Sequence, residues 1–149
     1  MHITRESLTT ELFMELIELV KEHNDEICAQ HGELNPFLEV YFFLEEHGRL
    51  DIIVCRDEGR VVGYMVLCTD LNHHHKDLLV GTSMALYVLK EYRGKGVSKK
   101  LLEAGEEVLK GREADVMVIS CPAKRDLTKY YAKLGFDPME HTFFKKLGD

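Results

Sequence analysis

One short segment of the sequence carries the residue types that bind a compact anion. Residues 92–98 read Tyr-Arg-Gly-Lys-Gly-Val-Ser and lie between an apolar run at 78–89 and a stretch with helical spacing. Glycines let the backbone come close to a ligand, and the free N–H groups and positive dipole end of a following helix attract negative charge. Arg93, Lys95 and Lys99 add positive charge at the rim of this turn. The segment therefore predicts a site for a phosphorylated ligand, and its charge suits a pyrophosphate group.

The charge of the whole chain narrows what that ligand can be. The formal net charge is -7, yet the window 90–100 holds five basic residues against the single acid Glu91. An acidic protein repels nucleic acid over most of its surface, so a short basic segment favours a small anionic ligand over a nucleic-acid footprint. We therefore expect no nucleic-acid partner. Binding with a steep dependence on salt would be needed to revive that alternative.

Length and composition predict one domain that spans residues 1–149. A chain of this length with 45% hydrophobic residues can bury a single core without disulfides or structural metals. No stretch approaches the roughly 18 unbroken apolar residues of a membrane-spanning helix, so neither secretion nor a membrane partner is expected. The four cysteines lack the CxxC spacing of zinc sites and suit a reducing cytoplasm, which is the expected location. They are Cys28, Cys55, Cys68 and Cys121.

The spacing of apolar residues predicts the elements that position the turn. Runs rich in β-branched residues indicate strands, and apolar residues three to four apart indicate amphipathic helices. In chain order we expect a strand near 2–5, a helix that Thr9 or Thr10 caps, a helix from Asn35-Pro36 to Gly48, three meander strands at 50–55, 61–69 and 78–89, a helix at 94–110, a strand at 114–120, a short helix at 125–134 and strand material at 136 and 141–147. Gly81, inside the third meander strand, predicts a bulge. This order of elements predicts an α/β fold with a mixed sheet.

Two common phosphate-binding motifs are absent, and the signature of a third family is matched. The chain contains neither the GxxxxGKS/T of a Walker loop nor a GxGxxG turn near the start of a βαβ unit. Its strand-to-helix turn resembles the R-x-x-G-x-G/A signature of the GCN5-related N-acetyltransferase (GNAT) family through Arg93, Gly96 and Ser98, with Ser98 in place of the usual small apolar residue. The resemblance extends to 86–88 and to 130–136, which is similar to the family's Tyr-x-Lys-Leu-Gly-Phe segment. The order of elements is also similar over the whole length.

This resemblance implies a GNAT-like α+β fold, with one mainly antiparallel central sheet flanked by helices in three layers. It also implies acetyl-CoA as cosubstrate and no metal. In the family, free backbone groups on the strand before the turn hold the pantetheine arm, here at Leu86, Tyr87 and Val88, and an N–H such as that of Val88 polarises the thioester carbonyl. The pyrophosphate turn corresponds to Arg93, Gly94, Lys95, Gly96, Val97 and Ser98. Tyr131 matches the tyrosine that protonates the departing thiolate, whereas Tyr130 is expected to be structural.

The resemblance leaves the general base open. Family members often carry a glutamate on the long strand, but residues 78–89 contain no carboxylate. The base is therefore a side chain from elsewhere or a chain of water molecules to bulk solvent. The side chains considered are Glu45, Glu46, Asp70 and the loop histidines His73, His74 and His75. Three adjacent histidines on one loop rarely point at one ion, so we interpret them as a solvated loop rather than a metal site.

The implied reaction is acetyl transfer from acetyl-CoA to a primary amine of a small molecule or a peptide. In the family, the segments at 27–37 and 138–142 shape the acceptor pocket. The acids in or near them are Glu26, Glu33, Glu39 and Glu140. Their charge favours a cationic acceptor, such as a polyamine, an aminoglycoside-like molecule, or the lysine or N-terminal amine of a peptide.

Two further questions stay open at this point. The chain could instead be a non-catalytic GNAT-fold module that binds a protein partner and retains CoA binding. A homodimer could form through an edge strand of the terminal segment, and the sequence does not decide between one copy and two.

Overall fold

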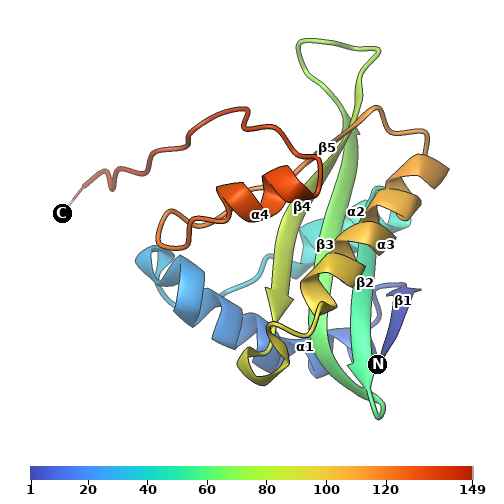
Figure 1. Cartoon of the computed structure of the whole chain (residues 1–149), viewed down its shortest axis with the longest axis vertical. Helices are drawn as coiled ribbons and strands as arrows, with labels where there is room; N and C mark the ends of the chain where they lie inside the picture. Colours follow the sequence, from blue (N-terminus) through green and yellow to red (C-terminus); the bar gives the residue numbers. More distant parts are fainter. Residues whose placement is uncertain (149) are drawn as a thin grey trace.

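A five-stranded sheet forms the centre of the protein in the computed structural model, which describes residues 1–148 (Figure 1). The strands follow one another across the sheet in chain order. They are β1 (His2–Glu6), β2 (Leu50–Asp57), β3 (Arg60–Leu71), β4 (Leu79–Val88) and β5 (Val116–Val118). The first four are antiparallel to their neighbours, and only β5 runs parallel to β4. The predicted mixed and mainly antiparallel sheet is confirmed.

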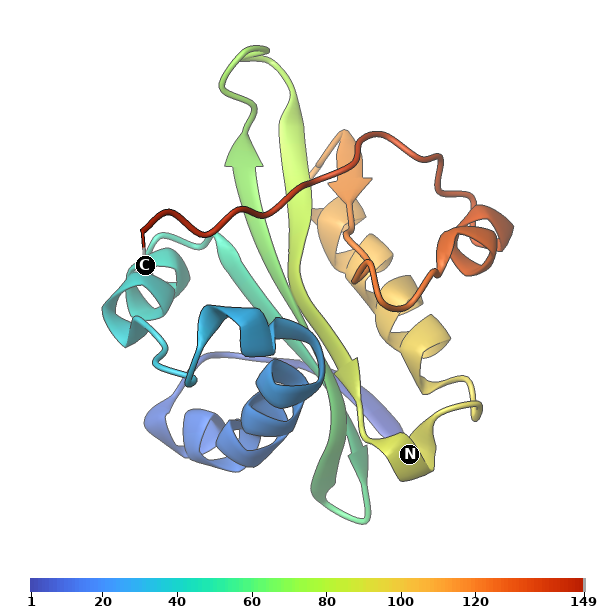
Figure 2. The same cartoon turned by 90° about the vertical axis from the view of Figure 1, so that its left-hand side faces the viewer.

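Helices cover both faces of this sheet. They are α1 (Thr10–His23), which continues into the π-helical turn η1 (Asn24–Cys28) and the 3-10 turn η2 (Ala29–His31), then α2 (Leu38–Glu46), the short turn η3 (Lys90–Tyr92), α3 (Val97–Gly111) and α4 (Thr128–Lys133). Figure 2 shows α1 and α2 on one side of the sheet and α3 on the other, which confirms the three predicted layers. Within residues 1–148, none of the helices has both the length and the apolar character needed to cross a membrane.

The alternation of side chains along β3 explains why helices are needed on both faces. Met65 and Leu67 are fully buried on the face of the sheet that α3 covers. Gly105 of α3 leaves room for their side chains. Tyr64 points the other way and bonds to His23 of α1. Successive residues of a strand face opposite sides, so the continuous buried run at 61–67 requires helices on both faces of the sheet. The core therefore lies on both sides of β2 and β3.

Gly81 has a different role from the one predicted. The irregularity between β3 and β4 lies further along, where Val66 pairs with Ala85 and Leu67 pairs with Ser83, so that β4 has one extra residue. At Gly81 a Cβ atom would lie 2.3 Å from Cδ2 of Leu109. The glycine is required because α3 packs directly against the backbone of β4 at this point. The predicted bulge at Gly81 is therefore wrong.

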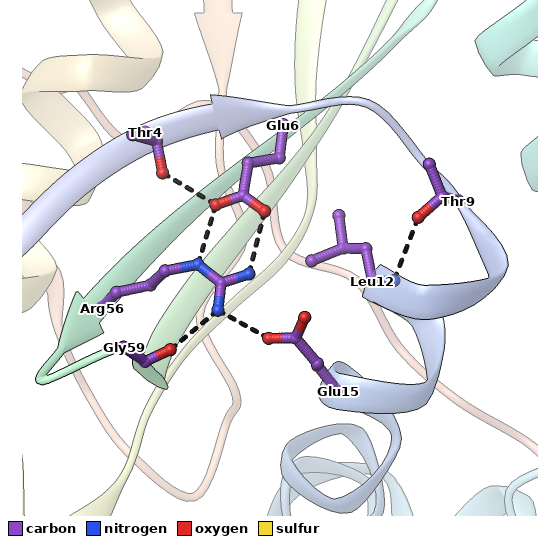
Figure 3. A network of polar contacts seen from close by, with 7 residues as sticks. All are labelled: Thr4, Glu6, Thr9, Leu12, Glu15, Arg56 and Gly59. Carbon is purple, nitrogen blue, oxygen red and sulfur yellow. Dashed lines mark hydrogen bonds and ion pairs between the residues drawn. The ribbon is translucent and has the colours of Figure 1, made fainter.

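A network around Arg56 fixes the start of α1 to the corner of the sheet (Figure 3). Its guanidinium donates to both carboxylate oxygens of Glu6 on β1 at 2.9 Å, to Glu15 on α1 at 2.6 Å and to the backbone carbonyl of Gly59 at 2.9 Å. Thr9 caps α1 as predicted, because its hydroxyl accepts a backbone N–H from the first turn at 3.1 Å. These contacts set the direction of α1 and hence the position of its far end.

The terminal strand predicted at 141–147 does not form. Residues 137–148 contain no helix or strand, and Figure 1 shows this tail running away from α4 and from the sheet. Phe143 and Leu147 are 91% and 86% exposed, and the ring of Phe144 meets the ring of His31 edge to face with centroids 5.2 Å apart. Two adjacent phenylalanines followed by two lysines lack the alternation that gives a strand one apolar face. The edge strand proposed for a homodimer is thus missing from the described residues.

Candidate active site

A cleft opens where β5 separates from β4. The two strands pair only from Val80 to Thr82, opposite 116–118. Beyond that point β4 continues to Val88, whereas the chain after β5 turns towards α4 (Figure 2). Within residues 1–148, no strand pairs with 83–88 on this side, so backbone N–H and C=O groups face the opening. The cleft has a volume of about 440 Å³.

Most of the residues predicted to bind the cofactor line this cleft. They are Leu86, Tyr87, Val88, Arg93, Gly94, Val97 and Ser98, and the predicted catalytic residue Tyr131 lines it as well. Lys95 and Gly96 belong to the same turn but do not line the cleft itself. The opposite wall comes from the end of α1 and from η1, through His23, Ile27 and Cys28. The structure therefore brings residues from both ends of the chain to one opening.

The turn between β4 and α3 has the backbone geometry of an anion cradle. Gly94 and Gly96 have φ angles of 75° and 79°, in the left-handed region that favours glycine. A Cβ at either position would meet no atom within 4 Å, so the backbone conformation rather than crowding requires glycine there. Gly96 precedes α3, and no side chain caps the first turn of that helix. Its N–H groups are therefore free to bind a ligand with negative charge.

Arg93 is held by a partner that the sequence did not reveal. Its two terminal nitrogens donate to both carboxylate oxygens of Glu26 at 2.9 and 2.8 Å, and its Nε donates to the carbonyl of Val88 at 2.9 Å. The hydrogen bonds from Arg93 hold the pKa of the Glu26 carboxyl below its usual range. The positive charge assigned to the pyrophosphate site is thus already balanced, and Arg93 joins the turn to η1. Of the two other basic residues of this segment, Lys99 pairs with Glu103 at 3.6 Å, and the ammonium of Lys95 lies over the ring of Tyr92.

The tyrosine pair on α4 divides into two different environments. The Tyr130 hydroxyl lies 3.0 Å from Oγ of Ser98, which ties α4 to the start of α3 and gives the serine a structural partner. Tyr131 is half-buried, and its ring meets Phe136 edge to face at 5.7 Å. Burial raises the pKa of Tyr131 to about 12, so the hydroxyl carries its proton at neutral pH. Tyr131 therefore lines the cleft as a protonated phenol, whereas the hydroxyl of Tyr130 is bonded to Ser98.

The side chains considered for the general base lie elsewhere. Glu45 accepts the backbone N–H of Leu8 at 3.1 Å, and Asp70 pairs with Arg49. The histidines 73–75 are exposed on the loop between β3 and β4, at the top of Figure 1. None of them lines the cleft, and no cluster of three or more metal-ligating side chains occurs within residues 1–148.

His23 is a cleft residue that the sequence analysis missed. It is the last residue of α1, and its Nδ1 lies 2.8 Å from the hydroxyl of Tyr64. Its ring stacks on Tyr87 of β4, with ring centroids 4.9 Å apart. A signal was available, because His23 follows the buried residues Leu16 and Leu19 at helical spacing on the same apolar face of α1.

The acidic acceptor region predicted from the sequence is only partly present. Ile27 lines the cleft, but residues 138–142 do not. None of the four acids named for this region lines the cleft, but Glu26 lines a smaller neighbouring pocket, where it is paired with Arg93 and lies 3.9 Å from Arg125. Of the four predicted acids, only the ion-paired Glu26 lies near the cleft, and Glu22 adds a second carboxylate beside Tyr87.

The sequence matches the family model described as Acetyltransferase (GNAT) domain over residues 48–138, which is more than half of the chain. The chain belongs to the GNAT family. The matched residues run from the start of β2 to just after α4 and include every residue predicted to bind the cofactor, together with Tyr131. Helix α1 and His23 lie outside the match.

Individual relatives agree with this assignment. N-alpha-acetyltransferase 30 from Schizosaccharomyces pombe is 32% identical over 84 residues, which are 56% of this chain and 55% of the relative, so the chain spans about half the length of that protein. An acetyltransferase from Trypanosoma brucei has a TM-score of 0.72 at 20% identity, covering 98% of this chain and 100% of that one. An aminoglycoside acetyltransferase from an uncultured soil metagenomic sample has a TM-score of 0.75 at 17% identity, with 99% and 100% covered. The two structures share the fold of this GNAT domain.

Proposed function

We propose that this GNAT domain transfers an acetyl group from acetyl-CoA to a primary amine by direct transfer. The observation that carries the proposal is the continuity of the cleft. It runs from the unpaired backbone of β4 to the uncapped first turn of α3, and the protonated Tyr131 is part of its lining. A cosubstrate with an extended polar chain attached to a pyrophosphate needs both features. The unpaired backbone groups can bind the chain, and the helix N-terminus can bind the pyrophosphate.

The residues present suit such a cosubstrate. Backbone groups of 86–88 would hold the pantetheine arm by hydrogen bonds that β5 does not make. The N–H groups after Gly96, with Lys95 and Lys99 at the rim, would bind the pyrophosphate. Acetyl-CoA supplies an acyl thioester whose carbon a neutral amine can attack. A backbone N–H near Val88 would polarise the carbonyl of that thioester.

Tyr131 is proposed to stabilise the leaving sulfur. With a pKa raised to about 12, its hydroxyl is a weaker acid than a thiol of ordinary pKa about 8.5. Full transfer of its own proton to the thiolate is therefore uphill, whereas donating a hydrogen bond to the developing negative charge is favourable. The proton that finally neutralises the thiolate would come from the attacking nitrogen.

The acceptor is proposed to be a small amine or the amine of a peptide. Two relatives carry names of these kinds, an aminoglycoside acetyltransferase and an N-alpha-acetyltransferase. The four free cysteines support a reducing compartment such as the cytoplasm.

Two observations favour the non-catalytic alternative. Residues 78–89 provide no carboxylate base, and the guanidinium of Arg93 is paired with the carboxylate of Glu26. A protein that had kept CoA binding and lost transfer would fit these two facts. It would bind CoA saturably but would acetylate no amine.

The test is acetylation of amines of three classes, spermidine, kanamycin and a hexapeptide with a free N-terminus. Release of CoA thiol and the gain of one acetyl group by the amine, detected by mass spectrometry, are expected for at least one class. Cys121 is an exposed thiol in the cleft, so the Cys121→Ser variant serves as the control for acetylation of the protein itself. Saturable binding of acetyl-CoA without any acetylated amine would favour the non-catalytic alternative, and no binding by the folded protein would reject both.

A further inference from the structure

His23, the last residue of α1, lines the cleft and is held there by contacts with two strands. Nδ1 of His23 is 2.8 Å from the hydroxyl of Tyr64, a residue that is only 2% exposed. The imidazole ring lies on the ring of Tyr87 with an interplanar angle of 19°. Contacts on a ring face and on one ring nitrogen leave little rotational freedom. The imidazole is therefore held in one orientation by β3 and β4.

The chemistry of this contact depends on which ring nitrogen carries the hydrogen. Burial raises the pKa of Tyr64, so its hydroxyl is protonated and can either donate to Nδ1 or accept from it. When Nδ1–H donates to Tyr64, Nε2 of His23 keeps its lone pair. Within residues 1–148, Nε2 has no hydrogen-bond partner, so it is the nitrogen left for a ligand.

We propose that His23 is the general base of this enzyme and that Tyr64 is a positioning residue that holds the hydrogen on Nδ1. This inference rests on the proposed acetyl transfer. In this role His23 replaces the carboxylate base that β4 lacks. The His23 ring lines the cleft from the end of α1 and stacks on Tyr87 of β4, so the base lies beside the strand proposed to hold the pantetheine arm.

The proton balance of the step is simple. The acceptor arrives as an ammonium ion, and Nε2 of His23 takes one proton from it to leave a neutral amine. The amine nitrogen forms a bond to the thioester carbon, and the bond from carbon to sulfur breaks. A second proton leaves the nitrogen and ends on the sulfur of CoA. The imidazolium of His23 then releases its proton to solvent, so that one proton is released in each turnover.

Burial favours the neutral form of His23 before the amine arrives. Burial lowers its pKa, Glu26 opposes this effect through its negative charge, and Arg93 adds to it. The titratable or charged groups around it are Glu22, Glu26 and Cys28 from the helical segment, Tyr41 from α2, Tyr64 from β3, Tyr87 from β4 and Arg93 from the turn. The rate constant kcat/KM should therefore fall on the acid side with an apparent pKa below the ordinary histidine value.

The first variant for the test is His23→Asn, because an amide can replace Nδ1 in the bond to Tyr64 but offers no base. With the best acceptor of spermidine, kanamycin and the hexapeptide, kcat/KM should fall by about 100-fold or more at neutral pH. The acid limb of the pH profile should disappear, while the affinity for acetyl-CoA measured by calorimetry stays unchanged. His31→Asn is the matched control, because His31 lies just beyond η1 and does not line the cleft.

The second variant, Tyr64→Phe, separates positioning from structure. It keeps the aromatic ring and removes the hydroxyl, so kcat/KM should fall by about tenfold and the acid limb should shift rather than vanish. Nitrogen NMR of ¹⁵N-histidine-labelled protein should show hydrogen on Nδ1 of His23 in the wild type and a mixture of tautomers in Tyr64→Phe. A merely structural role for Tyr64 would change neither the tautomer nor the pH profile.

The outcomes separate this inference from the proposed function. A wild type that neither binds acetyl-CoA nor acetylates any amine rejects the function. An active wild type with His23→Asn at full kcat/KM and with the same acid limb overturns the assignment of His23 and leaves the function standing. Should His23→Asn fail to fold, the titration of His23 in the wild type decides, because a pKa from NMR that differs from the acid limb of kcat/KM also overturns it.

Discussion

The two walls of the cleft are built in opposite ways. The wall at 86–98 is one continuous segment, and its proposed ligand contacts come from backbone groups that strand separation and two glycines set free. The wall at 23–28 depends on side chains, and its central contact joins residues 41 positions apart in the sequence, His23 and Tyr64. Ligand contacts made by the backbone of a short turn can be predicted from a local sequence motif. A contact between packed side chains that are distant in sequence cannot.

The walls are also joined to each other. The bidentate pair of Arg93 and Glu26 spans 67 positions and is the point where the glycine turn meets η1. Because this ion pair joins the two walls, we expect ligand binding at the glycine turn to affect the position of η1. Variants that act on one wall alone, or on the link, test whether this division is real.

The largest effect is expected from Gly96→Glu, which acts on the backbone wall alone. A carboxylate at the start of α3 repels a pyrophosphate, and at about 4 Å this repulsion amounts to several kcal/mol near a protein surface. The affinity for acetyl-CoA in calorimetry should fall by about 100-fold or more. Gly59→Glu is the matched control, because Gly59 has a φ of 86° and lies in the hairpin between β2 and β3. Equal losses in both variants would mean that backbone strain, not the site, is responsible.

A smaller loss is expected from Tyr131→Phe. Removal of the hydroxyl deletes one hydrogen bond to a developing negative charge, worth about 1.5–3 kcal/mol, so kcat should fall by about 10- to 100-fold. Binding of acetyl-CoA should change little, since the ring remains. Tyr130→Phe, which removes the partner of Ser98, should lower stability more than it lowers kcat. An unchanged kcat in Tyr131→Phe would remove Tyr131 from the mechanism.

Gly81→Ala should disturb the packing of α3 on β4 without changing a residue in either wall of the cleft. The new Cβ would collide with the buried side chain of Leu109, and overpacking of this kind costs about 1–3 kcal/mol in the free energy of unfolding. Urea denaturation measures this loss, and adding Leu109→Val should recover part of it. Gly111→Ala, where a Cβ meets nothing within 4 Å, is the control. Equal stability of the two single variants would contradict the packing of α3 on β4.

The smallest effect is expected at the link between the walls. Glu26→Gln keeps the shape of the side chain and removes its charge, which leaves the positive charge of Arg93 unbalanced beside the turn. The affinity for acetyl-CoA at low salt should rise by about two- to fivefold, the equivalent of ~0.5–1 kcal/mol, and the gain should shrink as salt increases. Glu22→Gln is the control, because Glu22 has no ion pair with Arg93. A loss of affinity in Glu26→Gln would show that the pair stabilises the turn instead.

The sequence allowed most of the fold to be predicted because its elements are locally consistent. Thr9 caps α1, and β2 and β3 have continuous apolar runs, so the spacing alone identified them. The prediction of a terminal strand was wrong. Phe143 and Phe144 are residue types common in strands, but no strand of the described chain pairs with them. Gly81 was misread because its reason lies in Leu109, which is distant in sequence.

The same distinction holds for the candidate site. The glycine turn and Tyr131 were predicted from contiguous motifs, and the structure places them at one cleft. The charge of Arg93 was misjudged because its partner Glu26 belongs to a π-helical turn that no local pattern identifies. Helical spacing after Leu16 and Leu19 could have placed His23 on the buried face of α1, but its possible role depends on Tyr64 and Tyr87, which are distant in sequence.

The central claim is that acetyl-CoA binds along β4 and the turn before α3, and the amide spectrum of ¹⁵N-labelled protein tests it most directly. On titration with acetyl-CoA, the largest shifts should occur at the amides of 86–88 and 94–98, with the well-resolved signals of Gly94 and Gly96 among them. The amide of Gly59 should not move. Shifts centred on any other part of the chain, or no shifts at saturating acetyl-CoA, would contradict the account.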